Sequence, residues 1–272
     1  MASREQNEYV LGTHDAELER LGLQHRVWSA QAFALWERAG FSPAHTVLDL
    51  GCGPGFATID LARLLPSARI IAIDESPRFV EHLKRRCEIE GVRNVDVRVG
   101  DAQALDLPAE SIDAVYSRWV LCFLPDPAAA VRGVARVLRP GGVFAVQDYF
   151  NWESLSLAPR SEIMARVVVA VGKSWRARGG DPDFVARLPS MMMGAGFDVR
   201  EITPHLRVAR PGTSVWQWPT TFFANFVPML VEQGFLTPSD LAEFTAEWRR
   251  RSDDPTTFFA APPAFDVIGV KC

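Results

Sequence analysis

Apolar residues of this chain gather in two kinds of segment. Between residues 46 and 150 there are five short runs of strand length, at positions 47–50, 69–73, 95–99, 112–117 and 143–147. The run at 47–50 lacks polar alternation, as expected for a strand buried on both faces of a parallel sheet. Segments with helical spacing lie between such runs. Strands that alternate with helices predict an α/β protein with a doubly wound, mostly parallel sheet.

Helix starts are marked by capping residues. Ser76 and Asp126 can each accept a hydrogen bond from a first helical turn, and each precedes a proline, which suits the first helical position. We expect helices from these positions through residues 84 and 138. Residues 9–39 also have helical character, with Thr13 as a cap and an apolar stripe over 28–39.

Beyond residue 148 the pattern becomes less regular. We expect helices over 160–178 and 185–195, a strand over 198–208 and a last strand over 265–270. The residues between the last two strands include a group of large aromatic side chains and a helix that begins at Thr237 and Pro238.

Composition limits the class of function. The chain has 272 residues, 48% hydrophobic and 23% charged, which are ordinary values for a globular protein. No apolar run reaches the roughly 18 residues of a membrane span, and the N-terminus lacks the apolar segment of a signal peptide. Four cysteines without a C-x-x-C pair favour a reducing cytoplasm and no metal site. The net charge of −4 argues against nucleic acid as a partner.

A glycine-rich turn follows the first predicted strand. Residues 49–55 read D-x-G-x-G-x-G, and glycines let a ligand approach bare backbone in front of a helix N-terminus. The dinucleotide fingerprint G-x-G-x-x-G needs glycine or alanine where this chain has Phe56, which disfavours a dehydrogenase. Taken alone, the segment is also compatible with a tight strand-to-helix turn.

This turn resembles motif I of class I S-adenosylmethionine (SAM) dependent methyltransferases, and the order of strands, acids and caps over residues 46–150 is similar to theirs. The resemblance implies a Rossmann-like, mostly parallel sheet of seven strands, with helical insertions after strand five and between the last two strands. It implies SAM as the cofactor. It places Asp49, Gly51, Gly53 and Gly55 around the methionine part of SAM.

Acidic residues follow the next two predicted strands. Asp74, with Glu75 beside it, ends the second strand about 20 residues after the glycine turn, where a carboxylate can accept the ribose hydroxyls of an adenosine. The alternative is a solvated loop acid. The resemblance implies that Asp101 accepts the adenine amino group and that the backbone N–H of Ala102 meets an adenine ring nitrogen.

The resemblance assigns further site residues after the fourth strand and in the N-terminal segment. It places Ser117, Arg118 and Trp119 in the wall of the methionine and methyl pocket; a buried turn with an outward Arg118 is the alternative. The residues similar to a segment that folds over the cofactor in related enzymes are Tyr9, Arg20, Gln24 and His25. We therefore expect an N-terminal helical lid (1–40), a SAM-binding core (41–150) and a C-terminal part of the same domain (151–272). A helix lying on one sheet edge is the alternative to the lid.

Aromatic residues are the candidates for substrate recognition: one follows the fourth strand, and the others lie in the insertion of some 50 residues between the last two strands, since insertions of this size usually carry substrate recognition. These residues are Trp119, Trp216, Trp218 and Phe222. Large apolar side chains at helical spacing mostly belong to a core, so a core role is the alternative.

The expected reaction is methyl transfer from SAM to an O, N or C nucleophile of a partly apolar or aromatic small molecule, by a monomer or homodimer. If a general base takes part, the candidates nearest the expected cofactor mouth are His14, His25 and Asp148. The alternative is a SAM-binding protein that does not methylate: a cyclase, a decarboxylase or a regulatory subunit.

Overall fold

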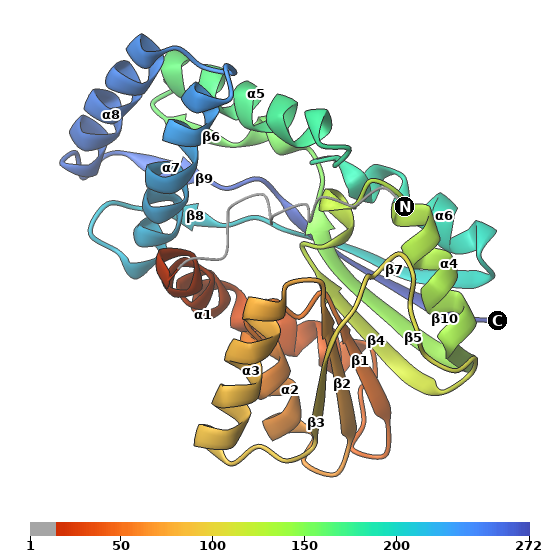
Figure 1. Ribbon diagram of the computed structural model, residues 1–272. Helices are drawn as coiled ribbons and strands as arrows, with labels where there is room; N and C mark the ends of the chain where they lie inside the picture. Colours follow the sequence, from red (N-terminus) through yellow and green to blue (C-terminus); the bar gives the residue numbers. More distant parts are fainter. Residues whose placement is uncertain (1–14) are drawn as a thin grey trace, which may run out of the picture.

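The computed structural model describes residues 15–272, which form a central sheet with helices on both faces (Figure 1). Its strands are β1 (Thr46–Leu50), β2 (Arg69–Asp74), β3 (Val95–Val99), β4 (Ile112–Arg118), β5 (Leu138–Tyr149), β7 (Phe197–His205) and β10 (Ala264–Lys271). Their order is β3-β2-β1-β4-β5-β10-β7; the first five pair in parallel, and β10 is antiparallel to both β5 and β7. The predicted seven-stranded, mostly parallel Rossmann-like sheet is confirmed. Because the strand order reverses beside β1, the carboxyl ends of β1 and β4 flank the crevice where such sheets bind ligands.

The helices cover the two faces of the sheet in sets. On one face, α1 (Asp15–Arg38) and α2 (Phe56–Leu64) pack with Ile70, and α3 (Pro77–Glu90) packs with Ala72 through Leu83. On the other face, α4 (Pro127–Val137) and α6 (Leu188–Gly194) belong to the cluster that includes Ile71. Successive residues of β2 thus serve opposite faces, as strand alternation requires.

Both predicted caps are present. The Ser76 side chain accepts a hydrogen bond from the Phe79 N–H, and the Asp126 side chain accepts one from the Ala129 N–H. Helix α3, which Ser76 caps, continues to Glu90, beyond the expected end at residue 84.

The C-terminal insertions form a second layer beside the sheet. Helices α5 (Glu162–Ala177), α7 (Ser214–Glu232) and α8 (Pro238–Ser252) gather around a small sheet of strands β6 (Ser156–Ala158), β9 (Phe258–Ala260) and β8 (Val208–Ala209) (Figure 1). The capped helix predicted at Thr237 is α8, where Thr237 and Asp240 form a capping box. The small sheet was not predicted, and the strand expected over 198–208 is divided between β7 and β8.

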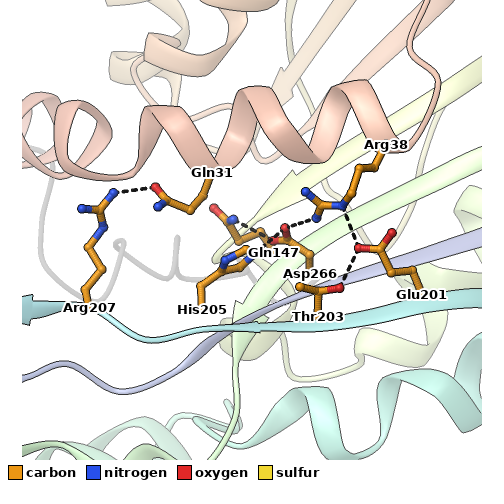
Figure 2. A network of polar contacts seen from close by, with 8 residues as sticks. All are labelled: Gln31, Arg38, Gln147, Glu201, Thr203, His205, Arg207 and Asp266. Atoms are coloured by element: carbon orange, nitrogen blue, oxygen red, sulfur yellow. Dashed lines mark hydrogen bonds and ion pairs between the residues drawn. The ribbon is translucent and has the colours of Figure 1, made fainter.

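The C-terminal half of α1 is fixed to the central sheet. Asp266 of β10 is fully buried and accepts hydrogen bonds from Arg38 Nη2 at 2.7 Å and Gln147 Nε2 at 2.7 Å, and it lies 2.6 Å from His205 Nε2 (Figure 2). Trp28 and Trp36 of the same helix are also fully buried. This half of α1 belongs to the core, and the lid over 1–40 stays a prediction.

Candidate cofactor and acceptor sites

The three glycines of the turn are needed for two different physical reasons. Gly51, Gly53 and Gly55 all have positive φ, at 70°, 54° and 80°. A Cβ at Gly51 would lie 2.3 Å from Val120, and one at Gly55 would lie 2.2 Å from Leu83. A Cβ at Gly53 would meet nothing within 4 Å. Packing therefore requires the outer two glycines, while the backbone of Gly53 faces open space.

A first cavity opens over this turn, between the ends of the strands and α1. It has about 1030 Å³ of empty volume including its mouth, the size of a small-molecule site. The predicted residues that line it are Gln24, His25, Asp49, Gly51, Gly53, Asp74, Glu75, Asp101, Ala102, Arg118 and Trp119. Arg20, Gly55 and Ser117 do not line it. Tyr9 and His14 lie outside the described residues 15–272.

The acids predicted to meet adenosine lie at the ends of adjacent strands. Asp74 accepts hydrogen bonds from the N–H groups of Gly53, at 2.8 Å, and Ser76, at 2.9 Å, which orient its carboxylate. Burial raises the pKa of Asp74. Asp101, after β3, accepts a hydrogen bond from the Gln103 N–H at 2.8 Å. Each carboxylate has about four lone-pair sites, so both retain capacity for a ligand.

Two charged residues lie at the turn: Asp49, which is buried, and Arg118, which is half-buried. Asp49 accepts a hydrogen bond from Thr58 Oγ1 at 2.6 Å, and burial raises its pKa to about 6. Arg118 donates from Nη2 to His25 Nδ1 at 2.9 Å, and its buried Nη1 has no hydrogen-bond partner among residues 15–272. A buried guanidinium N–H without a partner suits an anionic group of a ligand.

His25 is held between two charged side chains. Its Nδ1 lies against Arg118, which can only donate, and its Nε2 lies 2.8 Å from Asp60 Oδ2. Nδ1 is therefore the acceptor, and the proton is on Nε2. Burial, the largest effect, lowers the pKa of His25, consistent with a neutral ring. Both nitrogens are engaged, so His25 as found positions Arg118.

Asp148 is not among the residues that line the two cavities described here. It is fully buried and accepts a hydrogen bond from the Cys122 N–H at 3.1 Å. Burial raises its pKa to about 6. These contacts hold the turn that follows Trp119 and do not direct the carboxylate toward a substrate.

Asp148→Asn should remove a pH dependence of stability. Between the ordinary pKa of 3.8 and about 6, the native state binds one more proton at Asp148 than the unfolded chain does, so stability falls as pH rises through this window. Relative to the variant, the wild type should lose about 2 kcal/mol of unfolding free energy between pH 4.5 and 7. Urea denaturation at the two pH values measures this difference; equal losses in both proteins would contradict the buried, ionising carboxylate.

A second cavity of about 520 Å³ adjoins the first. Gln24, Trp119 and Phe123 line both cavities. Nine of the described residues that line the second cavity are aromatic: Trp119, Phe123, Tyr149, Trp152, Trp175, Trp218, Phe222, Phe223 and Phe259. Trp119 has positive φ of 52°, a strained backbone conformation for this residue, and its ring stacks on Tyr149 at 5.6 Å. This strained residue forms the boundary between the cavities.

The candidate substrate residues separate into two groups. Trp218 and Phe222 line the second cavity, and Trp218 Nε1 donates to Gln24 Oε1 at 3.1 Å. Trp216 lines neither cavity; its ring stacks on Trp248 at 4.9 Å and its Nε1 donates to Ser252. No local pattern in the sequence marks the wall residues Tyr149, Trp152, Trp175 and Phe259, because they come from four separate elements.

Arg20 also belongs to the second cavity. It is the only charged residue among the described lining residues, and it forms a two-bond ion pair with buried Glu17.

Residues 15–272 hold no group of three or more His, Cys, Asp or Glu side chains suited to a metal ion. No helix in that range has the length and apolar character needed to cross a membrane.

Comparisons with known proteins agree with this geometry. Residues 48–146 match a family described as a methyltransferase domain. The chain is 34% identical to an uncharacterized 37.1 kDa protein in transposon TN4556 of Streptomyces fradiae, over 71% of this chain and 57% of the relative. It is 34% identical to trans-aconitate 2-methyltransferase of Methylobacterium radiotolerans, over 61% of this chain and 59% of the relative. The chain thus spans somewhat more than half the length of these relatives.

Solved structures share the fold at lower identity. YcgJ of Bacillus subtilis superposes with a TM-score of 0.62 at 20% identity, over 88% of this chain and 97% of that one. The [4+2]-cyclase SpnF superposes with a TM-score of 0.57 at 18% identity, over 89% and 80%. The domain match, these relatives and the confirmed sheet support a class I, Rossmann-like methyltransferase domain around residues 48–146, with SAM as its cofactor.

Proposed function

We propose that the protein transfers a methyl group from SAM, bound in the first cavity, to a small-molecule acceptor bound in the second. The observation that carries this proposal is the shared wall. Gln24, Trp119 and Phe123 line both cavities, so molecules in the two cavities would meet there. Such a junction, enclosed by aromatic rings, limits water around the reacting groups.

The first cavity has the groups that SAM requires. We assign the methionine part to the turn around Gly53 and its carboxylate to the unpaired Nη1 of Arg118. Asp74 would accept the ribose hydroxyls, and Asp101 with the Ala102 N–H would meet the adenine. SAM supplies an electrophilic methyl on a sulfonium.

The protein contributes mainly alignment and desolvation. His25 and Asp148, the described base candidates, are held by other contacts. A well-oriented bimolecular step can gain several kcal/mol, about 7 or more, from proximity alone. We therefore propose that the acceptor presents an O, N or C nucleophile that needs no proton removed by these two residues.

The nine aromatic residues that line the second cavity favour a partly apolar or aromatic acceptor over a highly charged one. Trans-aconitate, named for the Methylobacterium relative, carries three carboxylates, whereas the described lining of the second cavity has one cation, Arg20. This lining disfavours trans-aconitate as the acceptor of this chain.

The direct test is incubation with methyl-labelled SAM and a panel of phenols, flavonoid-type rings and polyenes, followed by mass spectrometry. A product heavier by one labelled methyl supports the proposal. A product that is an isomer of its substrate, with SAM unconsumed, would instead support the cyclase alternative.

Substitution of the two acids should affect the recognition of different parts of the cofactor, the ribose and the adenine. Asp74→Ala and Asp101→Ala should each weaken SAM binding about 10 to 100-fold, since each removes a hydrogen bond to a charged group. Titration calorimetry with SAM and with its inosine analogue separates them. The analogue, which lacks the adenine amino group, should bind the wild type more weakly than SAM does. Asp101→Ala should bind the two about equally; a retained preference for SAM would place the adenine elsewhere.

A further inference from the structure

The residues shared by the two cavities carry N–H groups that no protein atom uses. Of the described residues that line both cavities, Phe123 is apolar, whereas Gln24 and Trp119 have polar atoms. The indole nitrogen of Trp119 is buried and has no hydrogen bond within residues 15–272. Since buried N–H groups are nearly always paired, an unpaired one in a cavity wall favours a ligand that supplies the missing acceptor.

Two neighbouring donors fix the amide of Gln24. Arg20 Nη1 and the Trp218 indole can only donate, and both contact the same atom of Gln24, at 2.8 and 3.1 Å. That atom must be the carbonyl oxygen, and the two contacts occupy its two lone pairs. The amide nitrogen has no hydrogen bond within the described chain and, unlike the Trp119 nitrogen, it is not buried. The Gln24 side chain therefore offers a ligand an N–H donor and no free acceptor.

The Trp119 indole is also held in place. Its ring stacks on Tyr149 at 5.6 Å, meets the ring of Trp28 edge-on at 5.5 Å and lies 5.1 Å from the Arg118 guanidinium. Its backbone N–H donates to the Gln147 carbonyl at 2.9 Å. Because these contacts fix the ring before a ligand binds, little conformational entropy is lost when its N–H forms a hydrogen bond.

Resting on the proposed function, we propose that Gln24 and Trp119 determine which acceptors bind at the junction of the two cavities. The acceptor presents there an uncharged oxygen, a carbonyl or an ether, which accepts from the Gln24 amide and the Trp119 indole. An acceptor with an ammonium or hydrocarbon group at this point leaves both N–H groups unpaired and loses affinity. The substrate class is thus an apolar ring system with a carbonyl or ether oxygen near the methylated atom.

Two uncharged probes of one shape isolate this contact. The first, 2-acetylnaphthalene, has a carbonyl, and the second, 2-isopropenylnaphthalene, has a CH2 group in place of its oxygen. Each is titrated against the full chain by ligand-observed NMR with saturating S-adenosylhomocysteine. The wild type should bind the ketone about tenfold more tightly than the alkene, because the alkene leaves the donors unpaired.

Two substitutions each remove one donor. Gln24→Glu keeps an oxygen for Arg20 and Trp218 and replaces only the NH2 group, and Trp119→Phe keeps an aromatic ring without the N–H. Each should lower the ketone preference about threefold or more, the scale of one hydrogen bond. The double variant should bring the ratio of the two affinities to about one or below.

Matched controls make the same chemical changes away from the junction. In Gln31→Glu the altered residue lies on the same helix, and its carbonyl accepts from Arg207 Nη2 at 2.6 Å. In Trp36→Phe the lost indole N–H is likewise buried and unpaired within residues 15–272. Neither Gln31 nor Trp36 lines the two cavities, so both controls should keep the wild-type preference. Circular dichroism establishes folding for each protein.

Several results would overturn the proposal: a wild type that binds both probes equally or binds neither, a folded single variant with the wild-type preference, or a control that loses it. A Gln24→Glu that loses affinity for S-adenosylhomocysteine and keeps the ketone preference would assign Gln24 to the cofactor instead. Should one single variant fail to fold, the other decides. A wild type that does not bind S-adenosylhomocysteine would refute the proposed function, and the probes, titrated alone, would still test the two donors.

Discussion

Gly53→Val should abolish detectable SAM binding and leave the protein folded. The Gly53 backbone faces open space in the first cavity, with no protein atom within 4 Å of a built Cβ. A valine side chain would fill that space and exclude the cofactor. Because φ at Gly53 is 54°, the change also costs roughly 1–2 kcal/mol of backbone strain. Titration calorimetry should show an affinity lower by about 100-fold or more, equivalent to about 2.8 kcal/mol.

The matched control is Gly91→Val. Gly91 ends α3 with φ of 68°, also has nothing within 4 Å of a built Cβ, and lines neither cavity. The two variants should lose similar stability, and only Gly53→Val should lose SAM. Similar SAM affinities for the two would mean that the glycine turn does not lie against the cofactor.

Trp218→Ala should remove most acceptor binding while SAM binding changes little. Trp218 forms a wall of the second cavity only, and its indole holds the Gln24 carbonyl. Its loss opens the cavity to water and leaves the Gln24 carbonyl with Arg20 as its remaining described donor. We expect the affinity for 2-naphthol to fall about 100-fold, as for an anchor residue at a binding site. Calorimetry with the probe and with S-adenosylhomocysteine measures both affinities in one protein.

Trp216→Ala separates this effect from lost packing. Trp216 and Trp218 are both buried, at 3% and 6% exposure, but Trp216 stacks on Trp248 in the insertion core. Each truncation should cost about 3–5 kcal/mol of stability. The control should keep its naphthol affinity where it remains folded; an equal loss of probe affinity in both variants would show that neither tryptophan contacts the acceptor directly.

The core of the fold could be predicted because its signals are local. The strand Val95–Val99 has the expected bounds, and both Ser76 and Asp126 cap their helices as expected. Apolar runs, proline and capping side chains act over a few residues, so one sequence is sufficient to find them. The strands of the small sheet have only two or three residues each, too few to show a period.

The direction of side chains was harder to predict than their position. Ser117 lies between Tyr116 and Arg118 of β4, and strand alternation sends these two toward the cavity and Ser117 away from it. Strand alternation is visible in the sequence alone, but the resemblance to the family's pocket residues placed Ser117 in the cofactor site. Trp216 and Trp218 are two residues apart on α7, so they face different sides of a helix that is apolar nearly all around. Their different surroundings depend on distant elements, α1 and α8, that no local pattern reveals.

A crystal structure of the full chain with S-adenosylhomocysteine tests the central claim most directly. We expect the adenine beside Asp101, the ribose hydroxyls on Asp74, the carboxylate at Arg118, and the sulfur directed past Trp119 toward the aromatic cavity. A molecule bound outside the first cavity, or one whose sulfur points away from the second, would contradict methyl transfer between these two sites.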